Sequence, residues 1–285
     1  MNQMNMGLYR QRRRANSIGL TLSMTAMVLG LLVLMWILFV LFKNGFSAVD
    51  LAMFTQDMPA PSSEGGGLRN AIIGSLLILS LSVVVSTPIG ILAGVYLAEY
   101  GDTSKTAEFT RFVTDLMLSA PSIVLGLFVY AIAVATVGNF SGFAGSLALS
   151  LIAIPVVVRT TENMLRLVPG SLREAAFALG APRWKVCLMV TLRASRAGVM
   201  TGVLLAVARI SGETAPLLFT ALSNQFFSVD MTKPMANLPV VIFQFAMSPY
   251  ENWIRLAWGG ALLITLAVLV LNIAARVFFR DRTTG

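Results

Sequence analysis

Two residues of opposite charge lie inside one apolar stretch of this sequence. Residues 197–220 carry Arg209 and, four residues later, Glu213. That spacing places two side chains on one face of a helix, where they can pair. At about 1.5 Å per residue Arg209 lies near the middle of a bilayer, where an Arg costs about 2.5–3.5 kcal/mol. The guanidinium favours an oxyanion, because its planar fork can hold two oxygens at once.

The same stretch contains residues that weaken a helix. Pro216 cannot donate a hydrogen bond to the carbonyl of Gly212, which leaves a polar group free inside the span. An intramembrane charge beside a loosened turn is typical of a path for a charged solute. The alternative is a structural ion pair that joins helices. Arg159, at the inner end of the preceding span, is a second candidate for this path, or else an ordinary interfacial anchor.

The segment 159–196 is too charged for a membrane interior, with seven Lys or Arg residues against two acids. Ser171 and Glu174 have the spacing of a capping box, which predicts a helix over 172–179 that ends at Gly180 and Pro182. A second amphipathic piece covers 183–192. These helices lie either on anionic lipid or in the groove of a cytosolic partner.

Composition sets the class of protein that holds these residues. The chain has 285 residues, of which 56% are hydrophobic and 12% are charged. Soluble domains carry about 25% charged residues, so we expect an all-α polytopic membrane protein. The sequence has no His and one Cys, which excludes His-metal sites, Cys–His nucleophile pairs and internal disulfides. We therefore expect no enzyme activity and no cofactor in this chain.

Six apolar stretches predict six transmembrane helices, at 18–42, 71–96, 112–137, 143–158, 197–220 and 253–279. The third is interrupted at 120–122. Lys and Arg concentrate in alternate connections, which places both termini in the cytoplasm. The predicted organisation is a basic cytoplasmic segment 1–17, a six-helix membrane domain 18–279 with the cytoplasmic loop 159–196, and a cytoplasmic tail 280–285.

The loop carries a family resemblance. Glu174-Ala175-Ala176 followed by Gly180 resembles the EAA loop of ABC importer permeases, and it lies between the fourth and fifth spans as that loop does. The family has a proline where this chain has Arg193. The resemblance implies a type I ABC importer permease fold, with the loop docked in a groove of an ATP-binding subunit. The chain has no G-x-x-x-x-G-K-[ST] loop, so ATP hydrolysis is expected in that partner.

Further segments resemble a narrower family. Residues 206–221 are similar to a motif of the permease subunits of the phosphate importer, and residues 120–126, 154–162, 223–226 and 237–239 resemble its A-type subunit. The resemblance implies a bacterial inner-membrane location, a C-type permease partner, two copies of an ATP-binding subunit and an extracytoplasmic phosphate-binding protein. Arg209 would then meet phosphate, Arg159 would receive it near the exit, and Glu213 would balance Arg209 or accept the proton of phosphate.

Other functions stay open on the sequence. A permease for another oxyanion, or the C-type partner itself, would carry much the same pattern. An autonomous anion transporter or channel could also hold an Arg at mid-membrane. It would more often show internally repeated halves, however, and its EAA-like loop would have no purpose.

Overall fold

The computed structural model describes residues 6–61, 63–101 and 104–278, and within these ranges every regular element is helical. Five helices are long and apolar enough to cross a membrane, and a bent pair makes a sixth when it is counted as one span. The predicted all-α polytopic fold is thus confirmed. Residues 1–5, the tail 280–285 and residue 279 at the end of the sixth span lie outside the described ranges.

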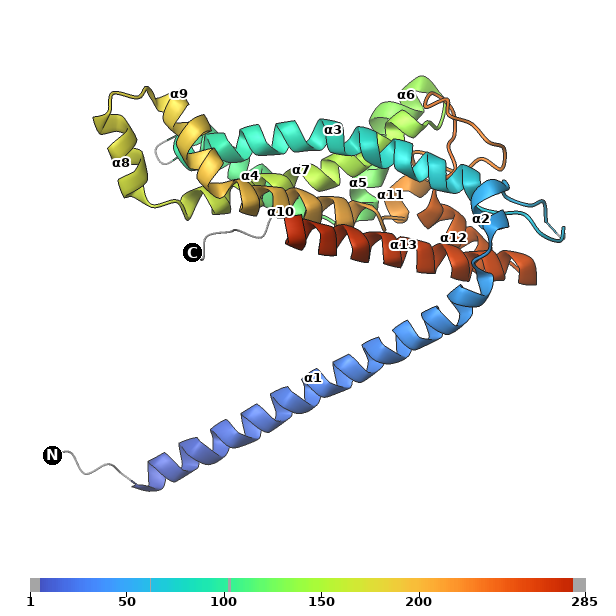
Figure 1. The fold of residues 1–285 in the computed structure, drawn as a ribbon, viewed down its shortest axis with the longest axis horizontal. Helices are drawn as coiled ribbons and strands as arrows, with labels where there is room; N and C mark the ends of the chain where they lie inside the picture. Colours follow the sequence, from blue (N-terminus) through green and yellow to red (C-terminus); the bar gives the residue numbers. More distant parts are fainter. Residues whose placement is uncertain (1–5, 62, 102–103, 279–285) are drawn as a thin grey trace.

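The bundle is built from long helices with shorter elements between them (Figure 1). The long helices are α1 (Met6–Ala48), α3 (Arg69–Glu99), α7 (Gly142–Arg166), α10 (Leu192–Ile210) and α13 (Glu251–Phe278). The shorter elements are α2 (Leu51–Thr55), α4 (Lys105–Ser119), α5 (Ser122–Val129), α6 (Ala135–Val137), α8 (Gly170–Ala178), α9 (Arg183–Lys185), α11 (Ala215–Leu218) and α12 (Leu238–Ala246), with the π-helical segments η1 (Tyr130–Val134) and η2 (Val186–Thr191).

The third predicted span is broken rather than kinked. α4 ends at Ser119, and the helix that continues from Ser122 is bent away from it by 107°. Ala120 is extended, with φ −68° and ψ 136°, because the ring of Pro121 disfavours the helical region for the residue before it. The predicted interruption at 120–122 is confirmed, and it turns the chain through more than a right angle.

Helix α7 is the centre of the bundle. In its most apolar window 67% of residues are buried, against none in α1. Gly90 and Gly94 bring α3 close to one side of α7, where a Cβ on Gly94 would lie 2.6 Å from the Cβ of Thr161. Gly198 and Gly202 do the same for α10 on another side. Small residues four apart allow backbones to approach closely, as is common in membrane helix pairs.

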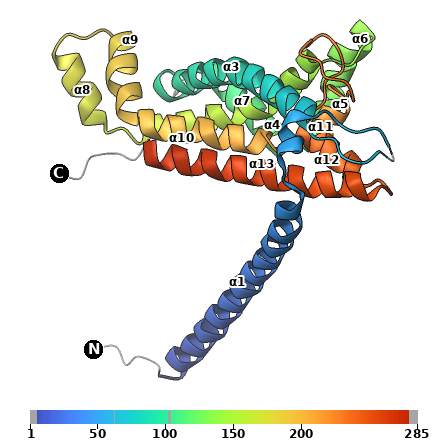
Figure 2. The same cartoon turned by 45° about the vertical axis from the view of Figure 1, so that its right-hand side comes forward.

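Helix α1 leaves the bundle as a long arm (Figures 1 and 2). It contacts α13 at its C-terminal end, where a Cβ on Gly45 would lie 2.7 Å from the Cβ of Leu262. Most of its other side chains are apolar and exposed, including Trp36 at 68%. The arm is longer than the predicted span 18–42, because the helix already includes the basic residues after Gly7.

Candidate solute path and docking helix

Arg209 lies in the last turn of α10, with its side chain exposed. The predicted ion pair with Glu213 is wrong: within the described chain no hydrogen bond or ion pair involves either side chain. The reason is that α10 ends at Ile210, so the two residues do not share a helix face. The chain turns at Ser211 and Gly212, and the amide of Glu213 donates to the carbonyl of Ile210 at 3.3 Å.

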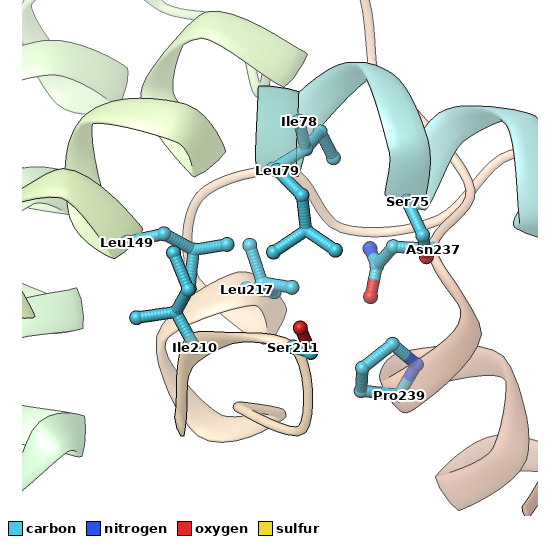
Figure 3. A pocket seen from close by; sticks show the side chains of 9 residues that line it. All are labelled: Ser75, Ile78, Leu79, Leu149, Ile210, Ser211, Leu217, Asn237 and Pro239. Carbon is cyan, nitrogen blue, oxygen red and sulfur yellow. The ribbon is translucent and has the colours of Figure 1, made fainter. Parts of the chain in front are cut away.

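The break after α10 is packed firmly, although the helix is interrupted. α11 lies against α5, where a Cβ on Gly126 would be 2.6 Å from the Cα of Pro216. A small cavity of about 10 Å³ lies beside the break, near the lower limit for one water molecule. Figure 3 shows the hydroxyl of Ser211 and the amide of Asn237 facing the same small space among apolar side chains. Ile210, the last residue of α10, is itself buried, so this packing positions the end of α10 and with it Arg209.

Arg159 lies inside α7, because this helix continues past the predicted end of the fourth span at Val158. Its Nε donates to Oδ1 of Asp115 on α4 at 3.0 Å, and its Nη2 also contacts both oxygens of Asp115. Its Nη1 reaches Oε2 of Glu162 at 3.4 Å. Arg159 therefore has two carboxylate partners, whereas Arg209 has none within the described chain.

Glu162 is the centre of a charge cluster that the sequence interpretation missed. Its side chain is 3% exposed and contacts Arg159, Arg166 at 3.1 Å and Arg111 of α4 at 2.8 Å. Together with Asp115, the cluster brings three Arg side chains and two carboxylates close to one another. Residues 159, 162 and 166 are three and four positions apart, which places them on one face of a helix. The fourth span was predicted to end at Val158, so no helix was expected to include them. Arg111 lies too far away in sequence to be found in this way.

The loop between α7 and α10 contains the predicted short helix. α8 begins at Gly170, with Pro169 at the N-cap and no side-chain cap, so the capping box of Ser171 and Glu174 does not form. Its end follows the prediction. Gly180 has φ +79° and donates to the carbonyl of Phe177, while the next amide donates to that of Ala176. This pair of bonds is the Schellman ending that favours glycine.

Helix α8 stands at one end of the molecule (Figures 1 and 2). Leu172, Phe177 and Leu179 are 46%, 44% and 89% exposed. Glu174 and Ala175 are also exposed, and Ala176 is half-buried. A short helix with projecting apolar side chains fits the groove of a partner better than it fits water.

The connection before α13 carries another short helix, α12. Asn237 caps it by accepting a hydrogen bond from the amide of Val240 at 3.1 Å. Earlier in this segment the hydroxyl and the amide of Thr232 donate to Asp230, which lowers the pKa of that carboxyl. The segment therefore has a defined conformation.

Comparison with known proteins defines the class. Residues 86–280 match the family model described as "Binding-protein-dependent transport system inner membrane component". A solved chain of the MetNI methionine ABC transporter aligns with a TM-score of 0.57 at 20% identity, over 74% of this chain and 95% of that one. A chain of a bacterial ABC transporter involved in the import of the acidic polysaccharide alginate aligns with a TM-score of 0.58 at 14% identity, over 95% and 100%. These likenesses show the fold of an ABC importer permease.

Relatives with curated names show which family of ABC importer permeases the chain belongs to. "Phosphate transport system permease protein PstA" of Yersinia pestis is 60% identical, over 95% of this chain and 92% of its own. The protein of that name from Haemophilus influenzae is 57% identical over 95% and 96%, and "PstA 1" of Mycobacterium tuberculosis H37Rv is 37% identical over 93% and 87%. The chain therefore belongs to the PstA family of transport system permeases, multi-pass proteins of the inner membrane.

Proposed function

We propose that this chain forms one half of the membrane path of an ATP-driven importer for inorganic phosphate. Its relatives at 60% and 57% identity are named phosphate transport system permeases. The other half is a C-type permease subunit. Two copies of a cytosolic ATP-binding subunit hydrolyse ATP, and an extracytoplasmic phosphate-binding protein delivers the anion. Both termini and α8 face the cytoplasm, in line with the positive-inside rule.

The exposed side chain of Arg209 carries this proposal. It has no partner within the described chain, and it ends a helix of a largely apolar span. An Arg that faced lipid there would be costly, so its place is at the second permease or in a water-filled path. A passing phosphate supplies the two oxygen acceptors that a guanidinium binds best.

Arg159 is the proposed second station, closer to the cytoplasm. Here the anion competes with Asp115 and Glu162 for the same guanidinium. Such competition weakens binding, and a transport site must release its ion as well as bind it. The three Arg side chains of the cluster still attract the anion to this part of the path.

Helix α8 (Gly170–Ala178), which we call the docking helix, is the proposed contact with the ATP-binding subunit. Glu174, Ala175 and Ala176 lie along α8, and Gly180 ends it. Their exposure, together with the projecting Leu172 and Leu179, supports a helix that inserts in a groove. ATP-driven movement of the subunit would reach the membrane helices through α8.

The test is uptake of labelled phosphate into vesicles that hold the full complex, with Arg209→Gln and Arg159→Gln compared with wild type. Each variant should lower uptake by about tenfold or more, because a hydrogen bond to a charged group contributes about 1.5–3 kcal/mol. Assembly and receptor-stimulated ATPase activity should persist. Intact uptake with Arg209→Gln would exclude this residue from the path, and loss of assembly would make its role structural.

A further inference from the structure

Arg173 connects the docking helix to the membrane helices. It lies on α8, directly before Glu174, and its Nε and Nη2 donate to Oε1 of Glu99 at 3.2 and 3.0 Å. Its Nη1 donates to the carbonyl of Val168 and its Nη2 to that of Leu165, both at 2.8 Å. We call this set of contacts the Arg173 clasp. It joins α8 to the last residue of α3 and to the C-terminal end of α7.

The clasp is shielded from solvent. The side chain of Arg173 is 22% exposed and that of Glu99 is 13% exposed. All three guanidinium nitrogens of Arg173 already donate to protein oxygens. A polar cavity of about 370 Å³ lies beside it, between Phe177 and Arg183 among others. Because each of its guanidinium nitrogens donates to a protein oxygen, Arg173 is suited to link helices.

The clasp matters because of how α8 is connected. The chain leads directly from α7 into α8, and from α8 through α9 and η2 into α10. Helix α3 has no such connection, and Glu99 is its last residue. Yet α3 packs along α7 through Gly90 and Gly94. A movement of α8 therefore reaches α7 and α10 along the chain. The clasp adds a direct contact between α8 and the end of α3, beside the packing of α3 on α7.

We propose that the Arg173–Glu99 pair transmits movement of the docking helix to α3, so that α3, α7 and α10 move together when ATP is hydrolysed. Arg173 and Glu99 are positioning residues in this scheme, since neither touches the solute. The inference rests on the proposed docking role of α8. Without the clasp, the ATP-binding subunit still docks and hydrolyses ATP, but less of the free energy of hydrolysis is used to open the path for the solute.

The experiment uses the full complex in sealed vesicles with the phosphate-binding protein. Arg173→Gln, Glu99→Ala and the double variant are compared for copurified ATP-binding subunit, receptor-stimulated ATPase activity and phosphate taken up per ATP. We expect uptake per ATP to fall about fivefold or more, the low end of usual coupling effects. The double variant should be no worse than the worse single variant, because both changes break one link. Glu108→Ala, which removes an exposed carboxylate from α4, should match wild type.

Three results would overturn the inference. Uptake per ATP could stay at the wild-type value in both single variants. The effects of the two changes could multiply, which would assign them to separate roles. The ATP-binding subunit could fail to copurify, in which case the pair shapes the docking surface itself. The docking role is checked separately with Leu179→Asp, which should weaken copurification. If Leu179→Asp does not weaken it, the docking role fails, whatever the clasp variants show.

Discussion

At the scale of single residues, Glu213 is the group whose role depends most on the end of α10. It is half-buried and forms no ion pair within the described chain, so its carboxylate is available to the solute. Inorganic phosphate carries a proton near neutral pH and can donate it, whereas sulfate has none to donate. We therefore expect Glu213→Gln to weaken discrimination against sulfate.

The measurement is displacement of labelled phosphate from the complex without its phosphate-binding protein, so that the membrane path alone selects the anion. Excess sulfate should displace phosphate from the Glu213→Gln complex and leave the wild-type complex loaded. Glu108→Gln, at an exposed position on α4, serves as the matched loss of one carboxylate. Equal displacement from Glu213→Gln and wild type would show that Glu213 does not select phosphate by accepting its proton.

Residue types were more predictable than residue partners. The cost of a buried charge singled out Arg209 from sequence, because that cost depends on the charge and its depth in the membrane alone. Arg159 was singled out by its place at the inner end of the preceding span. Their partners depend on where helices end. α10 ends before Glu213, which removes the predicted pair, and α7 continues past Val158, which brings Arg159 to Glu162. Asp115 and Arg111 come from α4, and their contacts require the tertiary fold.

At the scale of elements, apolar runs located the helices but not their bounds. A run ends at its first charge, whereas a helix continues for as long as its polar side chains find partners. The last turns of α7 continue in this way through Arg159, Glu162 and Arg166. The 107° bend at Pro121 was predictable as a break, since a residue before proline avoids the helical region, but not as an angle.

The packing of α3 on α7 gives a prediction at this scale. A Cβ on Gly94 would lie 2.8 Å from the backbone oxygen of Val158, so Gly94→Ala must push the two helices apart. Overpacking of this kind costs about 1–3 kcal/mol. We expect a lower melting temperature for the purified complex. Gly30→Ala on α1 is the control and should leave it unchanged, because an added Cβ there would meet no described residue outside its own helix within 4 Å. An unchanged melting temperature for Gly94→Ala would show that the close contact is not maintained.

At the scale of the whole molecule, the arm and the docking helix leave large apolar surfaces for other components. Helix α1 is exposed along most of its length, and α8 projects Leu172 and Leu179. Neither surface is stable in water, so both need lipid or protein against them. Composition predicted a membrane protein, and the resemblance of the loop implied a complex. No sequence pattern predicts that α1 splays away from the bundle, because an apolar span has the same kind of composition whether it packs on its own chain or on another component.

The arrangement across the membrane is the last prediction, and the chain is well suited to test it. Its one cysteine, Cys187, is 4% exposed and can be replaced by Ala. New cysteines at Arg12 on α1 and at Glu64 before α3 then report the two sides, since both positions are exposed. An impermeant thiol reagent should label Glu64→Cys in spheroplasts and reach Arg12→Cys only after the membrane is opened. Leu179→Cys should behave as Arg12→Cys does, and it should be protected when the ATP-binding subunit is present. The reverse pattern would place α8 outside, where no ATP-binding subunit could dock, and would end the proposed coupling.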